Sequence, residues 1–288
     1  MIIIKLNGGI GNQMFQYAFG RRMSIESKAG LKLDITGFND DKVYQRKFSL
    51  ACFNINENYA TERDLKRAQL FKSKSFIGKL IRVLSKIKKY NKRYILNEKT
   101  LFVFDSNVIR KYKSVYIEDN WQNEKYFTKI EDLIRKDFSF KEPLKGTVLN
   151  IADRIQCSNS VAIHLRKYDD IPNQSIHTLT LNYYFEAIKY LTERFNNLHF
   201  YIFSDNPEWA KENLLLSYDA TFVEQNKDYE DLRLMSLCKH QIIANSSYSW
   251  WAAWLNNNPH KIIISPQKWF GNSIYDTSDL IPEKWIRI

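Results

Sequence analysis

The sequence predicts an α/β protein with two domains, each built around a parallel β-sheet of the Rossmann kind. Short apolar segments alternate with helical patterns along both halves of the chain, which is typical of doubly wound sheets. A glycine-rich turn joins the first apolar segment to the first helical one. With 288 residues, the chain is long enough for two domains of common size.

The first domain begins with a strand, a glycine turn, a helix and a second strand. The apolar segment IIIKL runs into NGGIGNQ and then into a helical pattern, which is how a parallel βαβ unit starts. The expected elements of this domain are strand 2–6, helix 14–27, strand 31–34, strand 114–119 and helix 126–138. We expect the domain to cover residues 1–150.

The second half alternates more regularly and predicts a second doubly wound domain over residues 151–288. The expected strands are 161–165, 199–204, 220–225, 241–245 and 261–265. The expected helices are 181–195, 206–215, 229–239 and 247–257. We expect the join near 140–158, where KEPLKG interrupts the pattern.

Composition narrows the class of protein. Hydrophobic residues at 44 % and charged residues at 26 % are ordinary for a soluble globular chain. No apolar run approaches the roughly 20 residues that span a bilayer, and the opening MIIIKLN does not predict a signal peptide. Cys52, Cys157 and Cys238 are too scattered for a disulfide framework or a zinc site. We therefore expect a cytoplasmic protein.

Positive charge is concentrated in one segment. Of the formal charge of +11, residues 61–100 supply +10, from 13 Lys and Arg and 3 Asp and Glu. Within residues 71–94, apolar residues recur at three- and four-residue steps, which predicts a basic amphipathic helix. Such a helix could lie on the anionic inner face of a membrane, or pack on the first domain with its charges solvated. No nucleic-acid-binding module is recognisable.

Ligands of doubly wound sheets bind beyond the carboxyl ends of the strands, and four polar loops follow strands here. They contain Gly8, Gly9, Gly11, Asn12 and Gln13; Arg166 to Asp170; Asp205 and Asn206; and Ser246 and Ser247. Because these loops belong to both domains, we expect a ligand cleft between the two domains.

The glycine loop NGGIGNQ partly matches a dinucleotide-binding fingerprint. Gly9 and Gly11 follow a strand and open a helix, and Asp34 ends the next strand, where an acid would bind ribose. Met14 occupies the third glycine position, which counts against this interpretation. A plain βα turn and a phosphate site at a helix N-terminus both remain open.

The stretch VAIHLRKYDD places both signs of charge at a strand end. Arg166 can grip a diphosphate through two parallel hydrogen bonds, and Lys167 adds a second positive charge. Asp169 and Asp170 could serve as general bases or only balance Arg166. His164 is expected to have a supporting role.

Two further helix starts could bind phosphate or simply be capped. Asp205 or Asn206 precedes Pro207, and Ser246 and Ser247 precede the tryptophan-rich helix. The five histidines are dispersed without an HxxxH pair, so the sequence does not indicate a metal site. The aromatic faces around Trp121 and Tyr126 would suit a sugar ring.

With these clusters identified, the chain resembles the α-1,2-fucosyltransferase family, glycosyltransferase family 11. The resemblance is carried by GGIGNQMFQYAFG, HLRKYD, FSDNPEW and ANSSYSWWAAWLN, and NWQNEKYF and PQKWF add to it. It extends through nearly the whole chain except roughly 50–110. The family signature H-x-R-R-x-D has Lys167 in place of its second Arg, so the planar fork is lost at that position.

The resemblance implies a GT-B arrangement of two facing Rossmann-like domains, with the donor bound by the second domain and the acceptor by the first. It implies inverting transfer of fucose from GDP-fucose to the 2-hydroxyl of a galactose, without a metal or other cofactor. Arg166, Asn12 and Asp169 are the expected catalytic residues. The expected donor-binding residues are Gly9, Gly11, Asn12, Gln13, His164, Arg166, Lys167, Asp205, Asn245, Ser246 and Ser247. The expected acceptor-binding residues are Trp121, Gln122 and Tyr126.

Two other functions compete with this one. An NAD-dependent oxidoreductase would use GGIG and Asp34, and a lipid- or polyanion-binding protein would act through residues 71–94.

Overall fold

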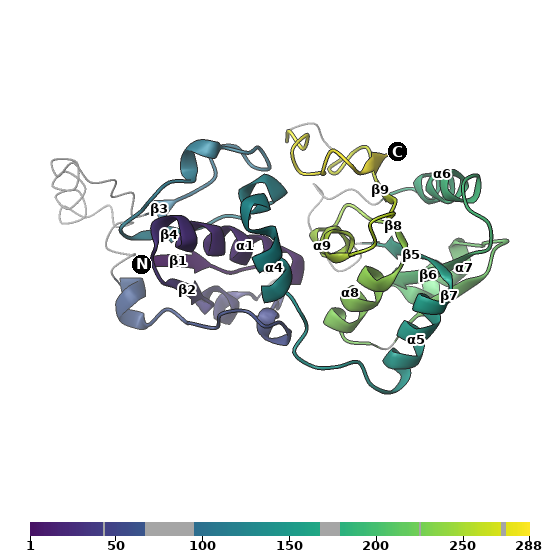
Figure 1. Cartoon of the computed structure of the whole chain (residues 1–288), viewed down its shortest axis with the longest axis horizontal. Coiled ribbons are helices and arrows are strands. Elements are labelled where there is room, and N and C mark those ends of the chain that lie inside the picture. The colour runs from purple at the N-terminus through teal and green to yellow at the C-terminus, as the bar shows by residue number, and fades with distance from the viewer. Residues whose placement is uncertain (43, 67–94, 168–178, 225, 272–274) are drawn as a thin grey trace. The chain divides into compact units, whose positions relative to one another are not determined.

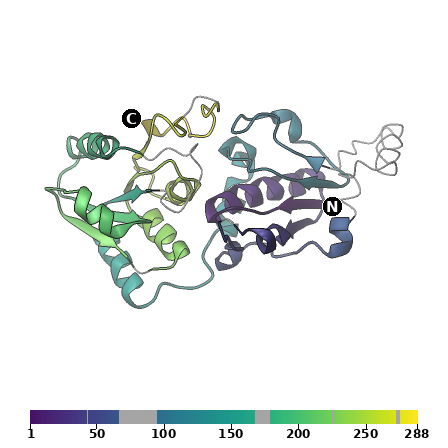
Figure 2. The same ribbon diagram turned by 180° about the vertical axis from the view of Figure 1, so that it is seen from behind.

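The computed structural model describes residues 1–288 except 43, 67–94, 168–178, 225 and 272–274. The chain divides into two compact units, which Figures 1 and 2 show from opposite sides. Unit 1 contains Met1–Lys141 and Ser278–Leu280, and unit 2 contains Glu142–Thr277 and Ile281–Ile288. The basic segment 71–94 and Asp169 lie outside the described residues.

Unit 1 is built on a parallel sheet. Its strands are β1 (Ile2–Lys5), β2 (Leu31–Asp34), β3 (Ile95–Leu96) and β4 (Val115–Ile117). They lie in the order β2-β1-β4-β3, and Ile2 pairs with both Leu31 and Val115. β1 is central and almost wholly buried, because its apolar side chains face covered surfaces on both sides of the sheet.

Helix α1 (Ile10–Ser27) follows β1 after the glycine turn. It begins after Gly9, whose backbone is extended, and it ends at Ser27, because the next residue, Lys28, adopts the left-handed conformation. Helix and sheet approach closely at Gly20, where an added Cβ would be 3.0 Å from the Ile4 side chain. The helix therefore starts four residues before the predicted range 14–27, since Ile10 is buried with the rest of its apolar face.

Between and after these elements, the described residues of unit 1 include several short helical turns and a short helix. These are η1 (Thr36–Asp40), η2 (Leu50–Cys52), η3 (Ser106–Val108), η4 (Glu124–Tyr126), η5 (Thr128–Ile130) and α4 (Glu131–Asp137). The single helix predicted over 126–138 is thus divided. Backbone N–H groups of Phe127 and Ile130 donate three residues back, which makes this stretch two 3₁₀ turns before α4.

Unit 2 contains a six-stranded parallel sheet. Its strands are β5 (Asn159–Leu165), β6 (Leu198–Ser204), β7 (Ala220–Val223), β8 (His240–Ile242), β9 (Ile263–Ser265) and β10 (Ile286–Arg287). They lie in the order β10-β9-β8-β5-β6-β7, which is the strand order of a Rossmann sheet. The predicted class, α/β with two parallel sheets, is confirmed.

Helices connect the strands of unit 2. They are α5 (Gly146–Cys157), α6 (Leu181–Thr192), α7 (Pro207–Asn213), α8 (Asp228–Leu237) and α9 (Ser247–Leu255). Helix α5 lies where the sequence predicted only a join, and it buries Val148, Ala152 and Ile155 along one face. Of the helices in the described part of the chain, none is long and apolar enough to cross a bilayer.

Candidate functional site

Each sheet has a point where the strand order reverses, and parallel sheets bind ligands at the carboxyl edge there. In unit 2 the chain runs from β5 through β6 to β7 and then returns to β8, which pairs with β5. In unit 1 the corresponding neighbours are β1 and β4. The loops after β5 and β8, and those after β1 and β4, are therefore the candidate sites of the two units.

Arg166 follows β5 and is held by a carboxylate from the neighbouring strand. Its Nη1 lies 2.9 Å from Oδ2 of Asp205, which follows β6, and both side chains are about one-sixth exposed (17 % and 16 %). The backbone N–H of Lys167 donates to the other oxygen, Asp205 Oδ1, at 2.8 Å. One carboxylate thus fixes a guanidinium and the following backbone at the carboxyl edge of the sheet.

The start of helix α7 explains why Asp205 is available for this role. The side-chain oxygen of Asn206 accepts the Trp209 N–H at 3.0 Å, and Pro207 occupies the first turn. Asn206 is therefore the cap, while Asp205 bonds Arg166. The Lys167 ammonium lies 4.8 Å from the centre of the Trp209 ring, within range of a cation–π contact.

His164, two residues before Arg166, is a buried neutral imidazole. Its side chain is 5 % exposed, and its ring centre is 5.4 Å from that of Tyr248. Burial, and secondarily the Arg166 charge, lower the pKa of His164 to about 3. Among the described residues its Nδ1 has no hydrogen-bond partner.

The loop after β8 contributes an amide and a helix start. The Asn245 side-chain amide donates to the carbonyl of Trp269 at 2.9 Å and is almost fully buried. Ser246 caps α9 by accepting the N–H of Tyr248, and Ser247 is the first residue of that helix. The N-terminus of α9 thus lies at the strand-order reversal, where its N–H groups can favour an anion.

Asp231, in the first turn of α8, is near this edge of the sheet but was not among the site residues predicted from the sequence. Burial is the main cause that raises the pKa of Asp231 to about 6; the hydrogen bond from the Asn226 amide works against it, and the charges of Asp228 and Glu230 add to it. Asp228 accepts the Tyr248 hydroxyl at its backbone carbonyl, so this helix start adjoins the ring beside His164. Because ligands of parallel sheets bind beyond the carboxyl ends of the strands, the residues after β7 could also have been considered, and these include Asp231.

In unit 1 the glycine loop brings Asn12 against the loop that follows β4. Gln122 donates from Nε2 to Asn12 Oδ1 at 2.8 Å. Gly8 has φ of +70°, which favours glycine, and a Cβ there would lie 2.7 Å from Asn12 Nδ2 and displace that side chain. Gly9 and Gly11 lie on either side of the start of α1.

The ribose-binding role suggested for Asp34 conflicts with its contacts. Asp34 is 3 % exposed and accepts hydrogen bonds from the Tyr116 hydroxyl and from the backbone and hydroxyl of Thr36. Its carboxylate is thus occupied inside unit 1, which removes the acid on which the NAD interpretation relied.

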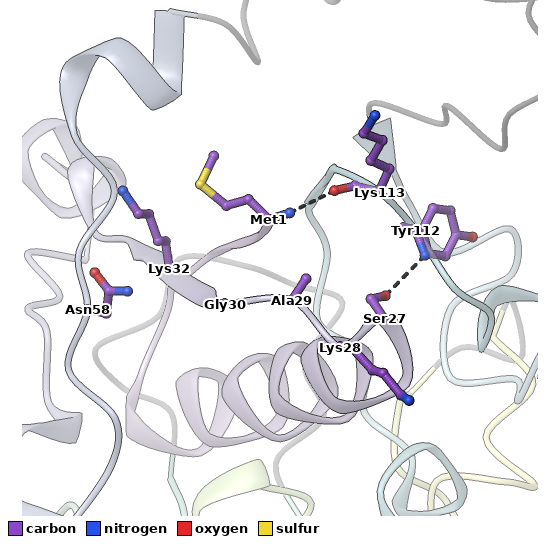
Figure 3. Close-up of a pocket in the computed structure, with 9 residues that line it drawn as sticks. All are labelled: Met1, Ser27, Lys28, Ala29, Gly30, Lys32, Asn58, Tyr112 and Lys113. Carbon is purple, nitrogen blue, oxygen red and sulfur yellow. Dashed lines mark hydrogen bonds between the residues drawn. The ribbon is translucent and has the colours of Figure 1, made fainter.

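A pocket of about 510 Å³ lies at the opposite edge of the unit 1 sheet, next to the amino ends of its strands (Figure 3). It is lined partly by the Met1 ammonium, Lys28, Lys32 and Lys113. The Met1 ammonium donates to the Lys113 carbonyl, and Lys32 pairs with Asp64 at 2.7 Å. It contains none of the predicted site residues.

Comparison with known proteins decides the family. Residues 1–288 match the model of a protein family described as Glycosyl transferase family 11. The chain belongs to glycosyl transferase family 11. It is thus a glycosyltransferase, and the NAD-dependent oxidoreductase is excluded as its identity.

Two relatives agree with this family 11 assignment, and a solved structure shares the fold. An alpha-1,2-colitosyltransferase from Escherichia coli is 37 % identical over 100 % of this chain and 99 % of its own. The O-antigen biosynthesis glycosyltransferase WbnK from the same species is 32 % identical over 98 % and 99 %. The crystal structure of NodZ alpha-1,6-fucosyltransferase has a TM-score of 0.50 at 14 % identity, covering 88 % of this chain and 91 % of NodZ. That likeness supports the predicted GT-B type of fold.

Among the residues predicted to contact ligands in this family 11 enzyme, the side chains of Gln13, Trp121 and Tyr126 are the most deeply buried. Gln13 is fully buried, donates to the carbonyls of Gly8 and Lys47 and accepts the N–H of Ser49. Trp121 is fully buried and stacks on Phe19 with ring centres 3.9 Å apart. The structure gives Gln13 a role in tying down the glycine loop.

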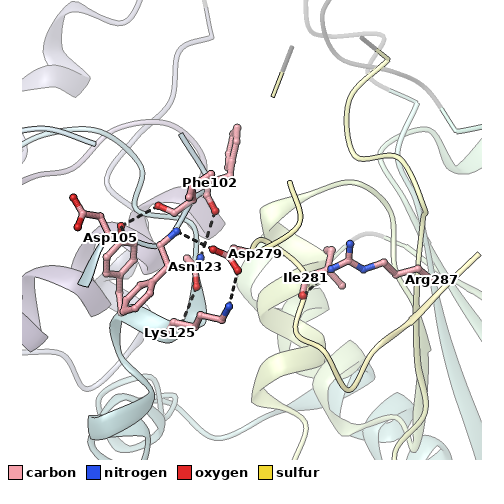
Figure 4. A network of polar contacts seen from close by, with 10 residues as sticks. Phe102, Asp105, Asn123, Lys125, Asp279, Ile281 and Arg287 are labelled. Atoms are coloured by element: carbon pink, nitrogen blue, oxygen red, sulfur yellow. Dashed lines mark hydrogen bonds and ion pairs between the residues drawn. The ribbon is translucent and has the colours of Figure 1, made fainter. Parts of the chain in front are cut away.

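Tyr126 contacts a polar network in unit 1, in which Figure 4 labels Asp105, Asn123, Lys125 and Asp279. It is 1 % exposed, and its hydroxyl accepts the Asp105 N–H at 3.1 Å. Asn123 donates to the carbonyl of Phe102, while Asp279 pairs with Lys125. The rings of Trp121 and Tyr126 are therefore part of the core, and a sugar could not stack on either one in this conformation.

Proposed function

We propose that this enzyme is a galactoside α-1,2-fucosyltransferase, which moves L-fucose from GDP-β-L-fucose to the 2-hydroxyl of a terminal galactose. Relatives named for α-1,2 transfer support the linkage, among them human galactoside alpha-(1,2)-fucosyltransferase 1, 23 % identical over 45 % of this chain and 40 % of its own. The observation that carries the proposal is Arg166, fixed by Asp205 where the strand order of unit 2 reverses. That is where a nucleotide diphosphate is expected in such a sheet.

The reaction is a single displacement with inversion at the anomeric carbon. The galactose 2-oxygen forms a bond to the fucose C1 as the bond from C1 to the β-phosphate oxygen breaks, and GDP leaves with the bonding electrons. Negative charge then grows on the diphosphate. Arg166 meets it with a planar fork and Lys167 with a point charge, so charge stabilisation in this proposal needs no metal.

Asn12 and Asp169 complete the proposed catalytic set. Asn12, at the start of α1, donates from its amide to the departing phosphate oxygen. Asp169 takes the proton of the attacking hydroxyl, in keeping with its place three residues after Arg166. In this scheme unit 2 binds the donor and unit 1 the acceptor.

GDP-colitose is the alternative donor, because a relative 37 % identical over the full chain is named a colitosyltransferase. Colitose is fucose without its 3-hydroxyl. A site that hydrogen-bonds this hydroxyl would reject the deoxy sugar by about 10⁴-fold, whereas a merely apolar wall would discriminate weakly. The ratio of the two specificity constants therefore tells these sites apart.

The experiment is turnover of the full chain with GDP-fucose, GDP-colitose, GDP-mannose and a UDP-sugar, each with β1,3- and β1,4-linked galactosides. We expect product only from the first two donors, with an α-1,2 linkage by NMR and a higher kcat/KM for GDP-fucose. A kcat/KM that favours GDP-colitose would establish the alternative. Turnover of the UDP-sugar alone, or attachment at another hydroxyl, would contradict the proposal.

A further inference from the structure

Two loops far apart in the sequence meet through a side-chain hydrogen bond in unit 1. Gln122 Nε2 donates to Asn12 Oδ1 at 2.8 Å, and Gln122 is only 7 % exposed. Asn12 lies in the first turn of α1, which follows β1, and Gln122 lies in the loop after β4. Strands β1 and β4 are the neighbours at the strand-order reversal of unit 1. The contact thus joins the two loops expected to face a ligand.

The loop that contains Gln122 is held in an uncommon backbone conformation. Asp119 has φ of +73° and Trp121 has φ of +54°, the left-handed region that side chains other than glycine rarely adopt. Glu98 holds this conformation by accepting the N–H groups of Asn120 and Trp121, while Asp119 accepts the N–H of Glu98. Gln16 adds a bond to the Asn120 side chain. Several groups therefore keep the loop beside Asn12, as is common where a functional side chain must be aimed.

Asn12 is confined from its other side by the glycine turn. The Asn12 side chain packs so closely against Gly8 that a Cβ at Gly8 would lie 2.7 Å from Asn12 Nδ2. The carboxamide of Asn12 therefore lies between the Gly8 backbone and the Gln122 side chain. Because an amide has one accepting and one donating end, a donor at its oxygen decides which end serves a ligand.

We propose that Gln122 is a positioning residue, which fixes the Asn12 carboxamide so that its NH₂ group serves the leaving diphosphate. The proposal rests on the role given to Asn12 in the proposed function. Gln122 was expected to touch the acceptor, but here its amide is used on Asn12. With the amide reversed, Asn12 would present an oxygen to an anion, and transition-state stabilisation would become repulsion.

The decisive variant is Gln122→Glu, which keeps shape but cannot donate to Asn12 when ionised. Asn12 would then turn its NH₂ towards Glu and its oxygen towards the phosphate. We expect kcat at pH 8 to fall about 100-fold, the usual cost of one lost transition-state donor, with a smaller change in KM. Towards pH 5 the protonated carboxyl can donate again, so the ratio of variant to wild-type kcat should rise at least tenfold.

Controls separate this role from a general loss of structure. Gln267→Glu, at an exposed position in unit 2, should leave kcat and its pH profile within twofold of wild type. Gln122→Leu should lose activity without the recovery at low pH. A Gln122→Glu profile parallel to that of wild type would overturn the proposal.

A double-mutant cycle keeps the test decisive if Gln122→Glu folds poorly. If Gln122 acts through Asn12, then Gln122→Leu should cost little once Asn12→Ala is present. Additive losses would refute the positioning role. The assays use whichever GDP-sugar the wild type consumes, so an error in the proposed donor would appear in the wild-type enzyme and leave this comparison intact.

Discussion

His164 and Asp231, near the carboxyl edge of the unit 2 sheet, have pKa values displaced towards their neutral forms. Burial lowers the pKa of His164 to about 3 and raises that of Asp231 to about 6. The directions are opposite because burial disfavours the charged form, which is the protonated imidazole in one case and the carboxylate in the other. This edge therefore holds Arg166 charged beside a neutral imidazole near neutral pH.

Asp231→Asn should stabilise the protein in a pH-dependent way. The raised folded-state pKa means that folding favours the protonated acid, so stability is highest below about pH 4 and is lost as pH rises through 6. The asparagine variant avoids this loss, so we expect a gain on the order of 1 kcal/mol at pH 8, reduced from the full shift because Asp231 is partly exposed, and almost none at pH 4. Urea unfolding at the two pH values measures it.

The exposed Asp153→Asn on α5 provides the matched control and should show no such pH dependence. Equal stabilisation by Asp231→Asn at both pH values would contradict the account of its burial.

At the residue scale, the sequence predicted where a residue lies relative to the strands better than whether its side chain is exposed. Arg166 could be placed because a strand directly precedes it, and Asp205 because a strand precedes a capped helix. Trp121 and Tyr126 were expected to be open to a sugar, but they fill the core beside α1. An aromatic residue in a loop looks the same in sequence whether it points inwards or outwards, since burial is decided by distant segments such as Phe19.

At the element scale, α1 depends on one close approach to the sheet. A Cβ at Gly20 would lie 3.0 Å from both Cβ and Cγ2 of Ile4, and Ile4 is fully buried in the central strand. The Ile4 Cβ is fixed to the backbone, so it can yield only if the helix moves. The spacing between α1 and β1, and with it the position of Asn12, therefore depends on a glycine here.

Gly20→Ala should destabilise the protein although alanine is the better helix former. Overpacking costs about 1–3 kcal/mol and helix propensity returns about 1, so we expect a net loss of about 1 kcal/mol in urea unfolding. Gly30→Ala is the control, because nothing lies within 4 Å of the added Cβ, and it should change stability by less than about 0.5 kcal/mol. Equal effects at the two glycines would refute the close approach.

Elements with a strong periodic signal were predicted well, and those set by long-range contacts were not. Strand β5 and helix α6 lie within a few residues of where an apolar segment and a helical pattern placed them. The two-residue strands β3 and β10 have too little sequence for a pattern, and they form only because β4 and β9 offer edges to pair with. Helix α5 was obscured by the break at KEPLKG just before it.

At the scale of the whole molecule, the two units repeat one rule on separate sheets. In each, the polar loops gather at the carboxyl edge where strand order reverses, while the pocket lined by lysines lies at the amino edge of unit 1. The loops at the carboxyl edges contain the residues that carry the family resemblance, whereas the residues that line the pocket do not. We therefore expect the nucleotide to bind at the carboxyl edges and not in the pocket.

Hydrogen exchange with and without GDP tests this expectation along the chain. Bound nucleotide slows exchange where it holds the backbone, since it stabilises only the liganded conformation. We expect protection in residues 165–167, 204–206 and 244–248 of unit 2 and in 8–13 of unit 1. Protection confined to residues 28–32 and 112–113 would instead assign the nucleotide to the amino-edge pocket.

GDP binding to Arg166→Ala, measured by titration calorimetry, tests the central claim most directly. Loss of a charge-assisted contact costs about 1.5–3 kcal/mol, so the affinity should fall about 10- to 100-fold, with partial recovery in Arg166→Lys. Arg194→Ala, which removes a guanidinium 3.5 Å above the Tyr190 ring, should bind like wild type. Wild-type affinity in Arg166→Ala would contradict the account.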